Sequence, residues 1–254
     1  WTDAWDVKIH RTILRNPADR CLYFATSLLH DVDQQREAPG GKLVKYDPRA
    51  DACEVLGLPM PMLYVQSIAA DFGRGKLYGF TYPAEAFFEF DLATRETKVV
   101  AYTGNSLHFS QPHNGAVDGE GWMWGTYAET RGFDEKPSGV PIRLFKYRPG
   151  DGLVCLPIGL SRKDDPGQLV RNPPLPEGAA PATDETRHAV DHGFCDSMAY
   201  DGIRYIYAGP TAGVLCRIDT RADRVEKIAH VIGSGRLPAL CLDGSGTLYG
   251  GGGL

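Results

Sequence analysis

Short runs in which apolar and polar residues alternate occur along much of the chain, separated by turn residues. Four of these runs are KLVKYD (42–47), AFFEFD (86–91), RLFKYR (143–148) and VLCRID (214–219). Each leads into a turn such as DPRAD or RPGDG and then into a second apolar run. Alternation with a period of two places successive side chains on opposite faces of a strand. The pattern therefore predicts four antiparallel hairpins.

A second signature precedes these hairpins: small or apolar residues, an aspartate, a glycine-containing turn and an aromatic residue. It occurs in SIAADFGRGKLYGFTY, GAVDGEGWMWGTY, SMAYDGIRYIYAGP and ALCLDGSGTLYGGG, and in weaker form in TILRNPADRCLYFAT. We predict that its aromatic residues occupy equivalent places on the second strand of successive sheets, that Asp118–Gly121 forms a turn, and that Trp124 packs between sheets. The aromatic residues are Tyr23, Tyr78, Trp124, Tyr207 and Tyr249.

The two signatures together predict an all-β fold, a β-propeller of four-stranded antiparallel blades. Most of the signature aromatic residues lie about 42 to 55 residues apart, which is the size of one blade. A β-sandwich, the rival fold, would show no fixed internal phase. The expected domain is a single propeller over residues 1–254, with an irregular Pro-rich insertion at about 159–187, of which Pro166–Thr186 forms no blade of its own.

The number of blades stays open, because four are complete and a fifth begins near Arg236 with one hairpin. Either the N-terminal stretch WTDAWDVKI completes the last blade of a five-bladed ring, or the chain is part of a larger propeller, for example a seven-bladed one.

Composition narrows the class of partner. The net charge of −5 and the lack of a basic run argue against nucleic acid, and no apolar run is long enough to span a membrane. The six cysteines are scattered, so they do not form a disulfide scaffold, and Cys21, Cys216 and Cys241 are expected to be buried.

Candidate chemistry comes from the register of the repeat. Polar side chains recur eleven or twelve residues before the signature aromatic residue, where the first strand of a blade leaves the central channel. Polar groups that converge from several strands usually line water or a ligand. Four of the five residues at this position are polar or charged, namely Arg11, Gln66, His113 and Asp196, and the fifth is Pro238.

The stretch PHNGAVDGEGWMW resembles the repeat of the streptogramin B lyase, gluconolactonase and NHL-type propellers. Pro112, His113, Gly121 and Trp124 are among the residues that match. In the lyase family a catalytic histidine and a glutamate from the following loop face each other across the channel. His113 matches the histidine, whereas Tyr127 stands at the glutamate position, with Glu129 two residues further on.

Several polysaccharide lyases are similar propellers that use histidine, tyrosine and arginine around a uronic acid. The resemblance implies β-elimination on an acidic, uronate-containing sugar in the channel. Arg11 would neutralise the substrate carboxylate, while His113 and Tyr127 would remove and donate the proton. The expected binding residues are Gln66, Asp196, His108 and Arg131.

The stretch HAVDHGFCD is a candidate site for zinc or another divalent transition metal. Its imidazole and thiolate donors, His188, His192 and Cys195, suit such ions, with plain loop residues as the alternative reading.

Two alternatives to the lyase remain open: a non-catalytic propeller that binds a small molecule or a protein partner, and a lactonase-like hydrolase. The expected partners are a small molecule or an oligosaccharide, not nucleic acid or a membrane. A secreted or periplasmic location is favoured.

Overall fold

The computed structural model describes residues 5–28, 34, 36–104, 113–128, 142–160, 195–210, 213–232 and 236–253. The chain divides into two compact units, Trp1–Ser106 and Leu107–Leu254, and each is described by itself. The predicted insertion at Pro166–Thr186 lies outside the described residues. Among the described residues, no helix is long and apolar enough to cross a membrane.

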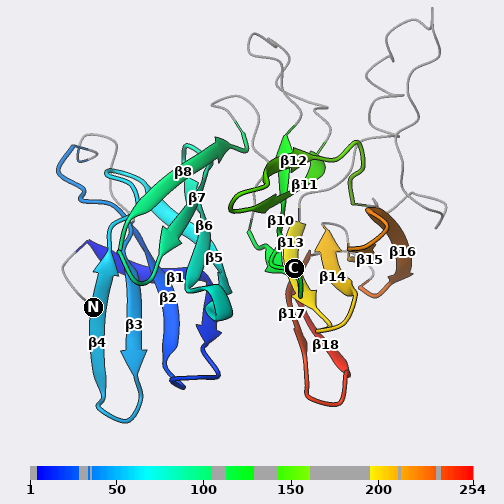
Figure 1. The fold of residues 1–254 in the computed structure, drawn as a ribbon, viewed down its shortest axis with the longest axis horizontal. Coiled ribbons are helices and arrows are strands. Elements are labelled where there is room, and N and C mark those ends of the chain that lie inside the picture. Colours follow the sequence, from blue (N-terminus) through cyan, green and yellow to red (C-terminus); the bar gives the residue numbers. More distant parts are fainter. Residues whose placement is uncertain are drawn as a thin grey trace, which may run out of the picture. The chain divides into compact units, whose positions relative to one another are not determined.

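The first unit contains two four-stranded antiparallel sheets whose strands follow one another in chain order (Figure 1). The first sheet consists of β1 (Asp6–Arg15), β2 (Leu22–Leu28), β3 (Leu43–Asp47) and β4 (Ala52–Gly57). The second consists of β5 (Tyr64–Asp71), β6 (Lys76–Tyr82), β7 (Ala86–Asp91) and β8 (Thr97–Tyr102), with the 3₁₀ turn η2 (Phe72–Arg74) between β5 and β6.

The second unit continues the same pattern. Its first sheet consists of β9 (Ala116–Val117), β10 (Met123–Ala128), β11 (Ile142–Arg148) and β12 (Gly152–Cys155). The next consists of β13 (Cys195–Tyr200), β14 (Tyr205–Pro210), β15 (Val214–Asp219) and β16 (Arg224–His230). In the last sheet the described strands are β17 (Arg236–Leu242) and β18 (Leu248–Gly253), which pair with each other. Consecutive antiparallel strands in repeated sheets of four are the blades of a propeller.

The described residues of the N-terminal segment belong to the first sheet. Asp6 pairs with Leu28 and Ile9 pairs with Thr26, so this stretch is the beginning of β1 in the first sheet. This strand is longer than the repeat suggested, and its early residues find backbone partners on β2. The number of blades, five or more, stays a prediction.

The signature aromatic residues occupy the predicted places. Each lies on the second strand of its sheet, and in all four-stranded sheets the third strand presents a charged residue directly opposite it. The pairs are Tyr23–Lys45, Tyr78–Glu89, Trp124–Lys146 and Tyr207–Arg217. The aromatic residues differ in their exposed fraction. Tyr23, Tyr78 and Trp124 are 5%, 0% and 0% exposed, whereas Tyr249 is 55% exposed.

The aspartate of the signature holds the turn that follows it. Asp118 accepts hydrogen bonds from the backbone N–H groups of Glu120 and Trp122 through Oδ1, at 3.0 and 2.9 Å. Its Oδ2 accepts a hydrogen bond from the indole Nε1 of Trp124 at 2.8 Å. In this sheet one carboxylate thus fixes both the turn and the aromatic residue. Gly121 completes the predicted turn with a positive φ of 85°.

Each unit has its own apolar cluster. In the first unit it joins residues of both sheets, including Tyr23, Leu43, Ile68 and Phe88. In the second unit the cluster contains Trp124 from one sheet with Ile206 and Cys216 from the next, so Trp124 packs between sheets as expected.

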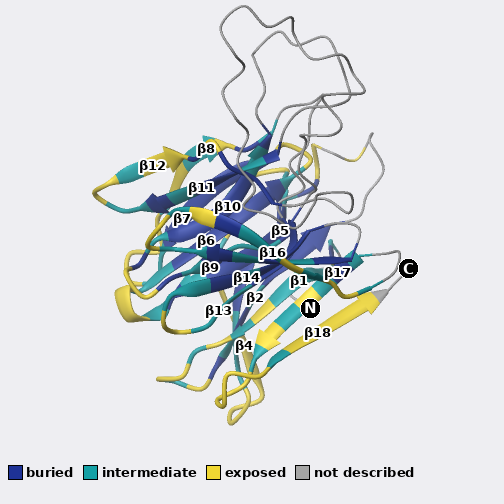
Figure 2. Cartoon of the chain, turned by 90° about the vertical axis from the view of Figure 1, so that its right-hand side faces the viewer, coloured by how far each residue is buried: buried dark blue, intermediate teal, exposed yellow. Residues whose placement is uncertain are grey.

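Three of the cysteines are buried and three are exposed. Cys21, Cys195 and Cys216 are buried, as expected for Cys21 and Cys216. Cys241 is exposed, which corrects the expectation; the buried residue of β17 is Leu237, near the start of the strand, whereas the residues towards its end are exposed or half-buried. Figure 2 shows the same difference at the level of strands, since β18 is largely exposed whereas β6 and β10 are buried.

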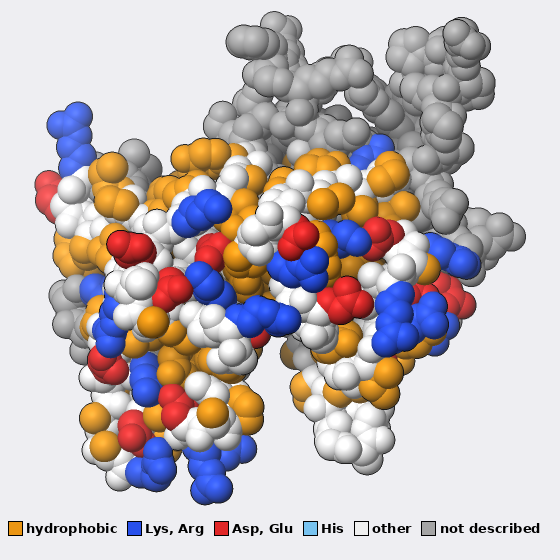
Figure 3. Space-filling view, viewed as in Figure 1, with side chains coloured by type: hydrophobic (Ala, Val, Ile, Leu, Met, Phe, Trp, Pro, Cys, Tyr) orange, Lys and Arg blue, Asp and Glu red, His pale blue; other side chains and the backbone are white. Residues whose placement is uncertain are grey.

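Charged side chains of both signs are interspersed over the face drawn in Figure 3. Ion pairs form within a sheet, as between Lys76 and Glu89, and between neighbouring sheets of one unit, as between Lys146 and Asp223.

Candidate functional site

Three polar residues of the second unit meet where the first strands of three successive sheets begin. His113 lies three residues before β9, Asp196 is the second residue of β13, and Arg236 is the first residue of β17. Asp196 is fully buried and His113 is 6% exposed. The repeat of the fold therefore brings one residue from each of three sheets to one place.

The three side chains form a single hydrogen-bonded cluster. The Nδ1 atom of His113 lies 3.0 Å from Oδ1 of Asp196 and 2.8 Å from Nη2 of Arg236. Arg236 donates from Nε to Oδ2 of Asp196 at 2.9 Å, and from Nη2 to Oδ1 of the same carboxylate. The neighbouring Asn114 donates from Nδ2 to the backbone oxygen of Asp196 at 2.7 Å. We call His113, Asp196 and Arg236 the His113 cluster.

The electrostatics of the cluster favour a charged carboxylate. Burial alone would raise the pKa of Asp196, but the hydrogen bonds from His113 and Arg236 outweigh it and lower that pKa below its ordinary value. The hydrogen bond to Asp196 in turn raises the pKa of Arg236. A fixed anion beside an imidazole orients the ring, an arrangement found around catalytic histidines.

Strand irregularities place several of these residues. Asp196 falls between the pairs Cys195–Pro210 and Ser197–Gly209, so it is the extra residue of a β-bulge in β13. Arg236 borders a similar shift before Ala239 in β17. A bulge re-aims a side chain relative to regular alternation, and bulges are over-represented beside active sites.

Similar strand irregularities occur in the first unit. Gln66 is the extra residue of a bulge in β5, and Arg11 lies within a register shift between Ile9 and Ile13 of β1. Gln66 is 4% exposed, and its Oε1 has no hydrogen-bond partner among the described residues. A buried amide oxygen without a partner costs about 1–3 kcal/mol, so such groups usually contact water or a ligand.

Tyr127, expected at the rim of the site, lies on β10 opposite Arg143 and is half-buried. Its neighbour Thr126 is 1% exposed, and Oγ1 of Thr126 has no partner within the described part of the chain. His108, Arg131, His188 and His192 lie outside the described residues. Whether Arg11 and Gln66 share one channel with the His113 cluster stays a prediction, because they belong to the other unit.

Cys195 does not present a metal ligand on a loop. It begins β13, is fully buried in the apolar cluster, and its thiol contacts the backbone oxygen of Ser197 at 3.4 Å. Burial raises the pKa of this thiol, which keeps it protonated at neutral pH. Within the described ranges, no group of three or more His, Cys, Asp or Glu side chains could hold a metal ion.

Arg236 is the residue that sequence reasoning missed. The register count selected Pro238, two residues further along the same strand, and the register shift between Arg236 and Ala239 cannot be read from the repeat. An available signal was the arginine itself, the one basic residue in the apolar run RLPALCL.

Comparison with known proteins shows similarity of structure but not of sequence. No family model and no curated protein matches the chain. The extracellular domain of a one component system from B. thetaiotaomicron aligns with a TM-score of 0.57 and 14% identity, covering 99% of this chain and 26% of that chain.

Two enzymes are similar to the same degree. Virginiamycin B lyase from Staphylococcus aureus aligns with a TM-score of 0.57 and 9% identity, over 96% of this chain and 66% of the lyase. A gluconolactonase from Xanthomonas campestris aligns with a TM-score of 0.57 and 13% identity, over 97% of this chain and 70% of the gluconolactonase. The chain thus spans about a quarter of the first of these three proteins and just under two thirds of the second. At such identities the likeness concerns the fold alone, and with the repeated four-stranded sheets it shows that the chain is a β-propeller.

Proposed function

We propose that the chain is a carbohydrate-active propeller enzyme of the lyase type, which acts by β-elimination on a uronate-containing sugar. The observation that carries the proposal is the His113 cluster, in which Nδ1 of His113 lies 3.0 Å from the buried carboxylate of Asp196. Nδ1 also lies 2.8 Å from Nη2 of Arg236, which can only donate, so the proposal requires the tautomer in which Nδ1 carries the proton and donates it to Asp196, with Nε2 as the basic nitrogen. A histidine held in this way is suited to act as a general base.

Arg236 supports an anionic substrate. Two of its nitrogen atoms bind Asp196, yet 41% of its side chain is exposed, so part of the guanidinium can contact a substrate carboxylate. Neutralisation of that carboxylate would acidify the proton on the neighbouring carbon. His113 would remove the proton, the bond to the leaving oxygen would break as the double bond forms, and Tyr127 would protonate that oxygen. Arg11, to which the sequence assigned the cationic role, remains a second candidate.

A decisive test follows the absorbance of the unsaturated uronate on a panel of acidic polysaccharides. With an active polymer, we expect His113→Gln to lower the rate by about 10²–10⁴-fold. The melting temperature should change little, since glutamine keeps a polar group near Asp196. His230→Gln, on the exposed end of β16, is the matched control and should retain full activity.

A binding protein is the second candidate, favoured by one observation: the carboxylate of Asp196 is already bonded by His113 and Arg236, so the His113 cluster needs no ligand to satisfy it. No absorbance gain with any polymer would reject the lyase proposal. Saturable binding of a uronate oligosaccharide without turnover would then establish the binding function. Acid release from aldonolactones, measured with the same variants, tests the lactonase alternative.

A further inference from the structure

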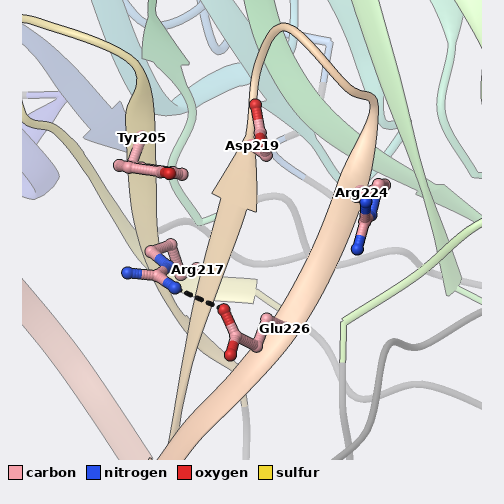
Figure 4. Close-up of a pocket in the computed structure, with 5 residues that line it drawn as sticks. All are labelled: Tyr205, Arg217, Asp219, Arg224 and Glu226. Atoms are coloured by element: carbon pink, nitrogen blue, oxygen red, sulfur yellow. Dashed lines mark hydrogen bonds and ion pairs between the residues drawn. The ribbon is translucent and has the colours of Figure 1, made fainter.

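The first strands of neighbouring sheets in the second unit lie side by side, yet in the described part of the chain they share no ladder. β9 lies beside β13 and β13 lies beside β17, and each belongs to a different sheet (Figure 1). Within one sheet, by contrast, strands are joined by their ladder and by side-chain pairs. An example is Arg217 on β15 with Glu226 on β16, beside a hollow of about 190 Å³ (Figure 4). The edge of a first strand therefore presents backbone groups that need other partners.

Two such backbone groups lie in the register shifts that place Asp196 and Arg236. The ladder between β13 and β14 skips Asp196, and the register shift in β17 between Arg236 and Ala239 includes Leu237. A residue that a ladder skips is left without its regular partner on the next strand. The backbone oxygens of Asp196 and Leu237 are nevertheless bonded, because each accepts a hydrogen bond from a side chain of the preceding sheet.

Both donors directly follow a residue of the His113 cluster in the sequence. Asn114, next to His113, donates from Nδ2 to the backbone oxygen of Asp196 at 2.7 Å. Ser197, next to Asp196, is 2% exposed and donates from Oγ to the backbone oxygen of Leu237 at 2.6 Å. Leu237 in turn directly follows the third residue of the cluster. The two bonds therefore connect the backbone of each cluster residue to that of the next.

Gly209 on β14 leaves the room that the second bond needs. It stands opposite Ser197, and a Cβ at Gly209 would lie 2.6 Å from Oγ of Ser197 and 2.7 Å from the backbone oxygen of Leu237. Cβ atoms essentially never approach other atoms so closely, so a side chain here would push β13 and β17 apart. The glycine fits a close approach between these two strands.

The first unit contains the same kind of bond. Ser27 on β2 is fully buried and donates from Oγ to the backbone oxygen of Val65 on β5 at 2.9 Å. Val65 borders the register shift at Gln66. On the other side of that shift, the backbone N–H of Ile68 donates to Oγ1 of Thr12 on β1 at 3.4 Å. In both units, hydrogen bonds from side chains thus join two sheets at a strand irregularity.

We propose that Asn114 and Ser197 are positioning residues, whose bonds hold the two register shifts in the form that brings Asp196 and Arg236 to Nδ1 of His113. Hydrogen bonds weaken steeply when their distance and angle change, and a one-residue slip would turn a side chain to the other face of the sheet. Neither positioning residue has to touch a ligand. The proposal concerns the geometry of the His113 cluster and holds whether the cluster catalyses or binds, so it does not rest on the proposed activity.

The ring nitrogens of His113 report on this geometry. In ¹⁵N-labelled protein, two-bond ¹H–¹⁵N spectra distinguish the two neutral tautomers from each other and from a mixture, and the His113 signals are identified by their loss in His113→Gln. We expect a single tautomer in the unchanged protein. Asn114→Ala and Ser197→Ala should each move the nitrogen shifts to values between those of the two tautomers, because Asp196 and Arg236 are then no longer held at fixed distances from the ring.

Ser27→Ala is the matched control, because it removes a buried hydroxyl that bonds a backbone oxygen of another sheet in the first unit. Ser27→Ala and Ser197→Ala should lower the melting temperature by a similar amount, about 2–4 °C, as expected for one buried hydrogen bond. Only Ser197→Ala should alter the nitrogen shifts of His113. The same alteration in Ser27→Ala would overturn the proposal, since it would then be a general consequence of lower stability.

Two further results would also overturn the positioning role: unchanged His113 shifts in either Asn114→Ala or Ser197→Ala, or a mixture of tautomers already in the unchanged protein. The outcome for the proposed function is separate. A single tautomer with its proton on Nε2, replaced by a mixture in both variants, supports the positioning role while it contradicts His113 as the general base.

Discussion

At the scale of single residues, one carboxylate binds both a turn and the signature aromatic residue in three of the five sheets. Asp118 binds the turn and the indole of Trp124, and Asp19 in the first sheet likewise binds the backbone of Cys21 and the hydroxyl of Tyr23. In the last sheet Asp243 binds Thr247 at 2.9 Å but reaches the hydroxyl of Tyr249 only at 3.4 Å. Asp118 and Asp243 stand six residues before their aromatic partner and Asp19 stands four residues before its own, and the burial of the three aromatic residues differs.

This difference predicts unequal effects of the same substitution. Asp118→Ala leaves the fully buried indole N–H of Trp124 without its partner, so we expect a loss of about 2 kcal/mol in the free energy of unfolding. Asp243→Ala in the exposed sheet should cause a clearly smaller loss, because water replaces the carboxylate there. Urea unfolding followed by circular dichroism measures both. Equal losses would show that the turn, and not the buried indole, accounts for the effect.

Residue-level prediction from the sequence succeeded where local chemistry repeats and failed where the strand departs from regular geometry. The register count placed His113 and Asp196 together correctly, since both lie a fixed distance from an aromatic residue that is held in place. It selected Pro238 instead of Arg236 because a shift in β17 changes which residue meets Asp196. A β-bulge adds a residue to one strand, and the pattern of apolar and polar residues in the sequence does not reveal where it lies.

At the scale of strands, glycine marks close approach between neighbours. Gly79 on β6 stands opposite Phe88 on β7, and a Cβ at this position would lie 2.3 Å from the ring of Phe88. Phe88 is fully buried in the apolar cluster, so the ring has little freedom to move away. By contrast, a Cβ at Gly251 on β18 would meet only the Cβ of Ala239 at an ordinary 3.6 Å.

The two glycines therefore form a matched pair for mutation. Gly79→Ala should destabilise the protein by about 1–3 kcal/mol through overpacking. Gly251→Ala should be neutral or slightly stabilising, because alanine restricts the unfolded chain without a clash in the fold. The melting temperatures of both variants, compared with that of the unchanged protein, test this difference. A stable Gly79→Ala protein would mean that β6 and β7 can separate more easily than the packing indicates.

At the scale of the whole molecule, the chain contains two compact units, each with its own apolar cluster. The alternating runs and the aspartate–aromatic signature were enough to predict the propeller, because every blade repeats the same local pattern. How many blades a ring contains depends on contacts between distant parts of the chain, which no local pattern records. The single domain over residues 1–254 stays a prediction.

Cooperative unfolding tests that prediction. In a variant carrying Trp1→Phe and Trp5→Phe, the remaining tryptophans, Trp122 and Trp124, report on the second unit alone. A single domain should unfold in one transition, with tryptophan fluorescence and far-ultraviolet circular dichroism giving the same midpoint in urea. Two separated midpoints would show that the units unfold independently.

The distribution of thiols has a consequence for handling the protein. Cys53, Cys155 and Cys241 are exposed, and they lie on three different strands, β4, β12 and β17. A molecule with one accessible thiol can only form a covalent dimer on oxidation, but a molecule with three is a branching unit. Air oxidation should therefore convert a concentrated solution into a cross-linked network, whereas a chain in which two of the three are serine would stop at dimers.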